Sequence, residues 1–307
     1  MKKQFISFLG LTKRNMLVYL KDKTTVFFSM LSPLIVLGLY LLFLKDNYIN
    51  VLIKTLSGFS ISASEKDVSP FINSWLICGL LGTSCITVPL SSLTALTYDR
   101  ENSIDYDFSA TPTKKGTILL SYLISSTINT FIISLIILII GFITLGIQGV
   151  FFSFGEVILG IVYLVLGSLS GSSIMMCIVC LFKKNSQVSA FTGIISAASG
   201  FLIGAYMPIS EYDECIQNIA NLLPGSHACG LYRNVLMENA LNKVSEIVPI
   251  EQGRQAFFDG MVDTFGIKAN FFGNTIDVVF MLFYVLITSV LFIGLDIFLF
   301  TKTSKRK

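Results

Sequence analysis

The chain has 307 residues, of which 53% are hydrophobic and 13% are charged, about half the ~25% of charged residues in soluble domains. With 26 Phe in the chain, too few polar side chains remain to cover a water-soluble particle, and a soluble enzyme is excluded. The net charge of +3 comes from basic residues beside apolar runs, and no basic face interleaved with aromatic residues indicates a nucleic-acid partner.

Residues 1–25 predict a basic amphipathic helix that lies at the inner membrane surface. Phe5, Leu9 and Tyr19 recur at helical spacing, while Arg14 points away from this apolar face. A frayed tail is the alternative interpretation of these residues.

Six apolar runs are each long enough to cross the ~30 Å core of a bilayer, which needs ~20 residues. They predict a single all-α transmembrane domain, with five spans within 26–206, an outer segment at 207–276, a sixth span at 277–300 and a tail at 301–307. The predicted spans are Val26–Leu44, Phe71–Thr97, Ile118–Ile147, Glu156–Phe182, Gln187–Tyr206 and Asp277–Phe300.

The distribution of Lys and Arg predicts the orientation, because basic side chains near span ends stay on the cytoplasmic side. With the N-terminus inside, 15 of the 22 Lys and Arg lie on the inner side and 7 lie outside. Both termini are therefore expected in the cytoplasm of a multi-pass cell-membrane protein, and the acidic segment 207–276 is expected outside.

Small residues and prolines mark special positions within the spans. Gly167-x-x-x-Gly171 and Gly200-x-x-x-Gly204 predict close helix approach, because helix packing in lipid relies on small residues. Pro33 is expected to interrupt the first span.

Few ionisable residues fall inside the predicted spans. Glu156, Asp277 and Asp296 lie near span ends, where they are expected to reach water or lipid headgroups, since a charge at the membrane centre costs ~2.5–3.5 kcal/mol. The lack of a mid-membrane ion ligand and of an internal repeat disfavours an ion-coupled secondary carrier, which remains an alternative.

The outer segment predicts two short helices that dip into, or lie on, the outer leaflet. Ser210-x-x-Asp213 is typical of a capping box at the start of the first helix, and the second begins near Ser226 after Pro224-Gly225. The residues assigned to these outer re-entrant helices are Pro208, Ile216, Ile219, Asn221, Pro224 and His227.

The rest of the outer segment predicts a third helix. Pro249 stands at a helix start, and Phe257 and Met261 follow at a four-residue step, typical of an amphipathic helix. Capping an exit, holding a partner and simple packing all stay open as its role. Cys215 and Cys229 both fall on the oxidising side, so a disulfide between them and two free thiols are both open.

Motifs for catalysis and for cofactors are missing from the sequence. No G-x-x-x-x-G-K-[ST] phosphate loop occurs, so an energised protein would need a separate ATPase that carries ATP and Mg. The single histidine, His227, falls in the outer segment, so an intramembrane hydrolase at Ser172 lacks a base within a span. We expect no catalytic site, metal or cofactor on this chain.

A compact charged segment at 98–115, between the second and third spans, carries the first part of a family resemblance. It contains Glu101 and Thr111-Pro112. Together with the outer stretch Gly204–Arg233, it resembles the type-2 ABC exporter permeases, the six-span class that includes drug-resistance, bacteriocin-immunity and polysaccharide exporters. Asn102-Ser103 replaces the Gly-Thr of the family's E-x-G-T pattern.

The outer stretch carries the second part of the resemblance. In the family, a glycine-bearing span end is followed by Pro, a short helix and an N-x-P-x-x-H/A pattern. Pro208, Asn221, Pro224 and His227 match this order, with one extra residue between Asn221 and Pro224.

The resemblance implies that 101–115 forms a short coupling helix in a cleft of a separate ATPase. It also implies two ATPase subunits, a second copy or a paralogous permease, surrounding membrane lipid, and outward movement of an amphiphilic drug, peptide or lipid-like molecule. A solvated loop at 101–115, and a membrane sensor or immunity protein that does not transport, are the alternatives. The expected coupling residues are Arg100, Glu101, Asp105, Tyr106, Phe108, Thr111, Pro112 and Lys114, and the expected substrate path is lined by Ser84, Thr87, Ser196 and Ser199.

Overall fold

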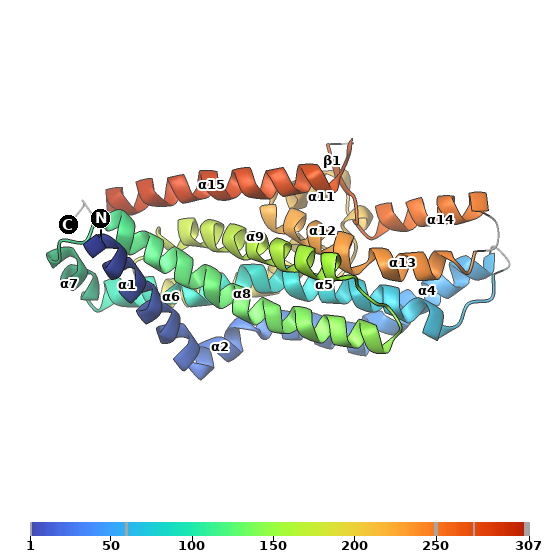
Figure 1. Ribbon diagram of the computed structural model, residues 1–307, viewed down its shortest axis with the longest axis horizontal. Coiled ribbons are helices and arrows are strands. Elements are labelled where there is room, and N and C mark those ends of the chain that lie inside the picture. The colour runs from blue at the N-terminus through green and yellow to red at the C-terminus, as the bar shows by residue number, and fades with distance from the viewer. Residues whose placement is uncertain (1, 59–60, 249–250, 273, 304–307) are drawn as a thin grey trace.

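The computed structural model describes residues 2–58, 61–248, 251–272 and 274–303. These residues form an elongated helical bundle with a small two-stranded hairpin, which the sequence did not predict (Figure 1). The elements are α1 (Lys2–Lys21), α2 (Lys23–Ser29), α3 (Leu31–Leu39), a π-helical turn (Tyr40–Leu44), α4 (Lys45–Gly58), α5 (Glu65–Ser92), α6 (Thr94–Glu101), α7 (Ile104–Ala110), α8 (Lys115–Ile147), α9 (Phe154–Val179), α10 (Asn185–Leu202), a 3-10 turn (Ile209–Glu211), α11 (Glu214–Leu222), α12 (Pro224–Leu236), α13 (Glu238–Ser245), α14 (Glu251–Thr264), β1 (Ala269–Phe271), β2 (Asn274–Ile276) and α15 (Val278–Thr303).

Five helices of the described chain are long and apolar enough to cross a membrane, which confirms the expected all-α membrane fold. They cover Leu31–Gly58, Glu65–Glu101, Lys115–Ile147, Phe154–Val179 and Val278–Thr301. α10, at the position of the predicted fifth span, is not among them, because its 18 residues include a polar first turn and several serines. The count of six spans therefore stays a prediction.

The two ends of the bundle differ in what they carry. One end, here called the junction end, holds the start of α1, the short helix α7 and the end of α15 (Figure 1). The other, here called the distal end, holds α4, α13 and α14. The β1–β2 hairpin pairs in antiparallel register, with Asn270 opposite Thr275, close to the start of α15.

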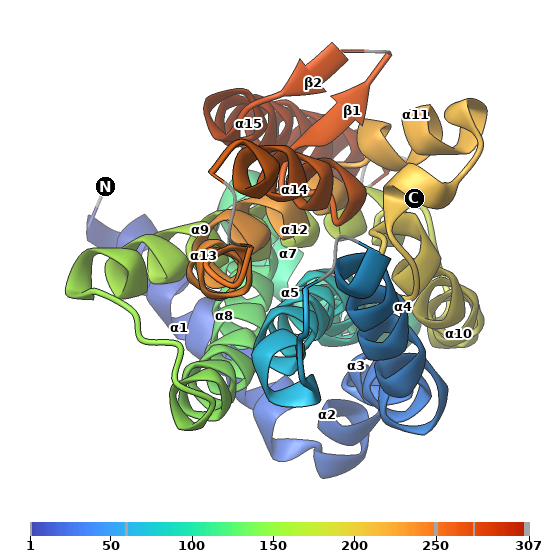
Figure 2. The ribbon, with the colours of Figure 1, turned by 90° about the vertical axis from the view of Figure 1, so that its right-hand side faces the viewer.

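α5 is the central helix of the bundle, and most of its side chains are buried. It packs against α8, α9, α10 and α12, and against α2, α3 and α4, as the view onto the distal end shows (Figure 2). Because so many helices pack on α5, any shift of α5 along its axis displaces their contacts together.

The first predicted span, Val26–Leu44, differs from the structure at both ends. Asp22 caps a separate helix α2 by accepting from the backbone amides of Thr24 and Thr25 (3.1 Å each). The long helix begins at Leu31 and continues through the π-helical turn to Gly58, because apolar side chains of 45–58 pack inward among polar ones. The helical run breaks at Met30, between α2 and α3, three residues before Pro33, which lies in the first turn of α3, so the expected interruption of the predicted span beside Pro33 is present.

An aromatic cluster fastens the distal end to α5. The ring of Trp75 lies 5.2 Å from Tyr48 and 5.8 Å from Phe265, and the ring of Phe71 lies 4.9 Å from Phe265, all in edge-to-face geometry. Phe265 follows α14, whose sequence pattern predicted a helix from Pro249 onward; Pro249 itself lies outside the described residues.

The glycine pairs differ in their roles. A Cβ at Gly171 would meet the carbonyl oxygen of Cys85 at 1.8 Å, and one at Gly167 would meet the Tyr232 hydroxyl at 2.0 Å, so the predicted close approach of α9 is confirmed. Gly200 and Gly204 instead serve the turn that ends α10: Gly204 has φ +67°, and a Cβ at Gly200 would meet the Tyr206 ring at 2.3 Å. The prediction of helix approach was wrong for this second pair.

Candidate functional site

The predicted coupling segment folds as two short helices at the junction end. α6 ends at Glu101, and α7 runs from Ile104 to Ala110. Ser103 takes a left-handed backbone conformation (φ 63°), which turns the chain sharply between the two helices. The Asn102-Ser103 replacement therefore still supports a tight turn.

Asp99 in the last turn of α6 joins α6 to α1 and α8. Its carboxylate is 1% exposed, accepts from Arg14 Nη2 at 2.7 Å, and accepts two shorter hydrogen bonds from Arg14 Nη1 and the Tyr122 hydroxyl. The hydrogen bonds that Arg14 donates to Asp99, together with the negative charge of Asp99, raise the pKa of Arg14 because both stabilise the charged guanidinium. Asn15 adds a hydrogen bond to Ser121 of α8 (3.3 Å).

These contacts agree with one prediction and add a residue that sequence reasoning missed. Arg14 points away from Phe5 and Leu9, which are 61% and 51% exposed, and toward Asp99, which is buried beneath α1. Asp99 was not among the expected coupling residues. Its partners lie 85 and 23 positions away in the sequence, so no local pattern indicated the pairing.

Arg100 and Glu101 join α6 to three more helices. Arg100 Nη1 donates to the carbonyl oxygens of Cys180 and Phe182, at 3.1 Å each, where α9 ends, and its guanidinium lies 5.6 Å over the ring of Phe300 in α15. Glu101 accepts from the backbone amide of Asn185 (3.0 Å) at the start of α10, where a negative charge is favourable. Both residues thus contact neighbouring helices of their own chain.

α7 is the part of the expected coupling segment that projects from this junction. Tyr106 is 49% exposed, and Asp107 beside it is exposed as well. Phe108 is half-buried, with the Arg14 guanidinium 5.5 Å over its ring. Asp105 lies in the first turn of α7 and is partly exposed.

The chain after α7 is held by the first helix. Gln4 donates to the carbonyl of Pro112 (2.7 Å) and accepts from the backbone amide of Lys114 (3.2 Å) and the hydroxyl of Thr117 (3.3 Å). Thr111, Pro112 and Lys114 are exposed. The expected coupling residues therefore fall into two groups: those in α7 and after it, which reach the surface, and Arg100 with Glu101, which bind the helix ends.

Asp296 departs from its predicted position. It was expected to reach water or headgroups near the end of its span, but in α15 it is 0% exposed. Neither carboxyl oxygen has a hydrogen-bond partner among the described residues. The packing of α15 on α9 covers this side chain completely, which the apolar pattern of the run alone did not indicate.

The expected substrate-path residues lie in two separate places inside the chain. Ser84 shares a hydrogen bond with Ser134 of α8 (2.7 Å), and Thr87 donates to the carbonyl of Ser29 (2.9 Å). Ser196 and Ser199 both bind Ser32 of α3, through the Ser196 carbonyl (2.7 Å) and the Ser199 hydroxyl (2.8 Å). All four are buried, so within one chain they fasten helices together and do not line one open surface.

The two helices predicted near the outer leaflet form α11 and α12, with different surroundings. Ile216 and Ile219 of α11 are 50% and 54% exposed, whereas most of α12 is buried between α5, α9 and α15. α11 ends at Leu222, just before Pro224, and Pro224 opens α12 at its first position, two residues before the predicted start near Ser226. Asn221 and His227 are linked, since His227 Nε2 lies 2.7 Å from the Asn221 carbonyl oxygen.

The predicted capping box before α11 was wrong. Asp213 is the N-cap residue but makes no side-chain cap hydrogen bond, and the Ser210 hydroxyl donates to the carbonyl of Thr264 (2.6 Å). Pro208 precedes the 3-10 turn that separates α10 from α11. Contact with the end of α14, distant in sequence, outcompetes the local cap.

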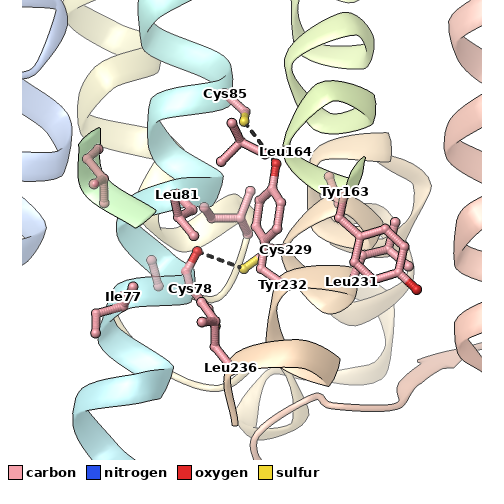
Figure 3. Close-up of a cluster of buried hydrophobic side chains, with 14 of the residues drawn as sticks. Ile77, Cys78, Leu81, Cys85, Tyr163, Leu164, Cys229, Leu231, Tyr232 and Leu236 are labelled. Carbon is pink, nitrogen blue, oxygen red and sulfur yellow. Dashed lines mark hydrogen bonds between the residues drawn. The ribbon is translucent and has the colours of Figure 1, made fainter. Parts of the chain in front are cut away.

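Of the two alternatives left open for Cys215 and Cys229, the structure has the free thiols. Cys215 is exposed on α11 and Cys229 is buried on α12, and both are free thiols. Figure 3 shows Cys229 pointing at α5, where its thiol donates to the carbonyl of Cys78 (3.4 Å), and Cys85 beside the Tyr232 hydroxyl (3.2 Å). The two expected partners face different surroundings because Cys229 serves the α5–α12 packing.

The model of the family described as ABC-2 type transporter matches residues 6–237, which span more than half of the 307 residues and include α6, α7, α11 and α12. Among curated proteins no match is found. The match agrees with the resemblance carried by the charged segment 98–115 and by the stretch 204–233. The chain therefore belongs to the ABC-2 type transporter family and is a multi-pass membrane subunit of an ABC transporter.

Proposed function

We propose that this chain is the permease of an ATP-driven exporter, energised by two separate ABC ATPase subunits and paired with a second copy or a paralogue. In this proposal the junction end faces the cytoplasm and α7 docks on the ATPase. The observation that carries the proposal is the arrangement at that end: α7 presents an exposed polar surface, and Arg14 links its Phe108 to the buried carboxylate of Asp99.

The last turn of α6 gives a physical route from α7 to the bundle. Asp99 holds α1 and α8, Arg100 holds the ends of α9 and α15, and Glu101 holds the start of α10. A push on α7 during ATP binding would be transmitted to all of these helix ends, because each is tied by at least one hydrogen bond or ring contact to the same turn.

The cargo surface in this proposal lies between two permease copies. The expected path residues Ser84, Thr87, Ser196 and Ser199 are buried within one chain, so in a single copy they do not line an open path. Large apolar side chains are exposed along α8 and α15, among them Ile140, Ile143, Leu291 and Phe298. Such a surface suits an amphiphilic drug, peptide or lipid-like molecule better than an ion.

Co-purification and ATP hydrolysis test the proposal. We expect the permease to co-purify with an ABC ATPase and to change its hydrolysis rate, and Tyr106→Ala on α7 to weaken both. Phe151→Ala, a change to an exposed aromatic residue in the α8–α9 connection, is the control and should leave both at the wild-type level. A permease without any effect on ATPase activity, or Tyr106→Ala with normal binding and hydrolysis, would refute the assignment of α7.

Asp296 favours the ion-coupled carrier as a second candidate, because an ionisable residue buried in a membrane helix is a functional-site hypothesis by default. A carrier of this kind would move its substrate into or out of vesicles that lack ATP when a proton or sodium gradient is applied. Transport that depends on ATP and ignores both gradients would exclude it.

A further inference from the structure

Asp296 carries a buried carboxyl group that lacks, in the described part of the chain, the hydrogen-bond partners that a buried polar group usually has. Its side chain is 0% exposed and both oxygens lack a hydrogen-bond partner among the described residues. An ionised carboxylate without a partner in an apolar environment costs several kcal/mol. Asp296 would therefore gain more than any exposed carboxylate from an arriving cation.

Arg100 is the cation that packs on the same face of α15 as this carboxyl, and other groups hold its guanidinium. The Arg100 guanidinium sits over Phe300, which is four residues after Asp296 and hence on the same face of α15. The Cys180 thiol lies near enough to feel the charges of both Arg100 and Asp296. Four helical residues correspond to about 6 Å along the axis, roughly one turn.

The present position of Arg100 is one that a long side chain can leave. Its guanidinium is held by two neutral carbonyls and one ring, without a carboxylate partner within hydrogen-bond distance in the described chain. One-turn shifts of a side chain between two sites on a neighbouring helix are an established form of switching, since packed interfaces have discrete arrangements. Asp296 supplies a second site of opposite charge one turn away.

We propose that Asp296 is a positioning residue of the coupling route: it binds the Arg100 guanidinium in a second conformation, reached when the end of α6 is pushed and the long Arg100 side chain moves about one turn along α15. In the conformation described here Arg100 binds the carbonyls at the end of α9. In the second conformation it leaves them and pairs with Asp296, which separates α6 from the end of α9 and ties it to α15. This inference rests on the proposed function, because the push on α7 drives the shift.

The test compares variants in a reconstituted complex of the full-length permease with the ABC ATPase that co-purifies with it. Asp296→Asn removes the charge and keeps the shape, Asp296→Glu restores the charge, and Arg100→Gln removes the cation. Asp277→Asn is the matched control, because it makes the same change at an exposed residue directly before the start of α15. The readouts are permease-dependent ATP hydrolysis and the thermal unfolding temperature of the permease alone.

We expect Asp296→Asn to lower permease-dependent hydrolysis about tenfold, within the ~5–150-fold range of coupling between sites, and to leave the unfolding temperature unchanged or raised. Arg100→Gln should lower hydrolysis by a similar factor, the double variant should lose no more than either single variant, and Asp296→Glu should recover part of the rate. Asp277→Asn should match the wild type in both readouts.

Each other outcome overturns a stated part of the argument. Wild-type hydrolysis in Asp296→Asn, or additive losses in the double variant, overturns the inference and leaves the proposed function standing. If Asp296→Asn lowers hydrolysis and also lowers the unfolding temperature of the permease, Asp296 has a structural role and the inference is also overturned. A wild-type permease that does not change hydrolysis at all overturns the proposed function, and the inference with it.

Discussion

Replacing Asp99 with Asn removes the charge that holds α1, α6 and α8 together while keeping the shape of the side chain. Asp99 is 1% exposed and accepts hydrogen bonds from both terminal nitrogens of Arg14 and from the Tyr122 hydroxyl. Breaking a buried pair by removing one charge costs ~3–5 kcal/mol, but the Arg14 side chain is 32% exposed and regains part of its hydration. We expect the free energy of unfolding to fall by about 2–3 kcal/mol.

Thermal unfolding in detergent measures this loss. The chain has a single tryptophan, Trp75, buried in the aromatic cluster at the distal end, so its fluorescence reports loss of the packed bundle. At ~2–4 °C per kcal/mol for chains of this size, the midpoint should drop by about 4–12 °C. Asp107→Asn, the same chemical change on the exposed side of α7, is the control and should leave the midpoint unchanged.

A double-mutant cycle makes this prediction specific to the ion pair. In an Arg14→Met background the partner cation is gone, so Asp99→Asn should cost much less than in the wild type. Equal midpoints for Asp99→Asn and Asp107→Asn would refute the energetic role of the pair. A full loss in the Arg14→Met background would show that Asp99 stabilises the fold through other contacts.

Three further predictions follow from single positions. Gly171→Ala should lower the unfolding midpoint by several degrees, because its Cβ would meet a backbone oxygen at 1.8 Å, whereas Gly193→Ala, with no atom within 4 Å, should not; equal midpoints would contradict the close contact. Burial lowers the pKa of His227 to about 4 from an ordinary ~6.5, so the unfolded chain binds more protons between these values and stability should fall by up to about 3 kcal/mol as pH drops from 6.5 to 4. His227→Gln should flatten that part of the stability curve measured by fluorescence, and an unchanged slope would contradict the buried neutral ring. A maleimide should label Cys215 but not Cys229 in the folded protein, and protection of both thiols until reduction would instead support a disulfide.

The apolar runs predicted the helices well where hydrophobicity alone decides the structure. The run predicted as Ile118–Ile147 lies within α8, which begins at Lys115 and ends at Ile147. The helix at 45–58 was missed because its polar residues resemble a loop, although Ile49 and Leu52 pack inward against the bundle. Whether such a polar segment forms a helix depends on its packing against distant segments, and the hydropathy of a local window carries no information about that packing.

The coupling role of the candidate site stays a prediction, while the contacts of its residues follow only from the structure. The sequence singled out the segment from Arg100 to Lys114, which lies within the residues that the family model matches. It did not show that Arg100 and Glu101 bind other helices of the same chain, or that Asp99 pairs with a residue 85 positions earlier. Which face of a short helix meets which neighbour depends on the assembled bundle, so these roles follow only from the structure.

The contacts made by the last turn of α6 depend on the exact length of this helix. Asp99, Arg100 and Glu101 point in three directions because each step along a helix rotates the side chain by about 100°. A one-residue insertion within α6 would rotate all three away from their partners at once, whereas an insertion at 102–103, in the connection to α7, would leave them in register. In engineered or natural variants of this permease, indels should therefore accumulate after Glu101 and be absent from the turn before it.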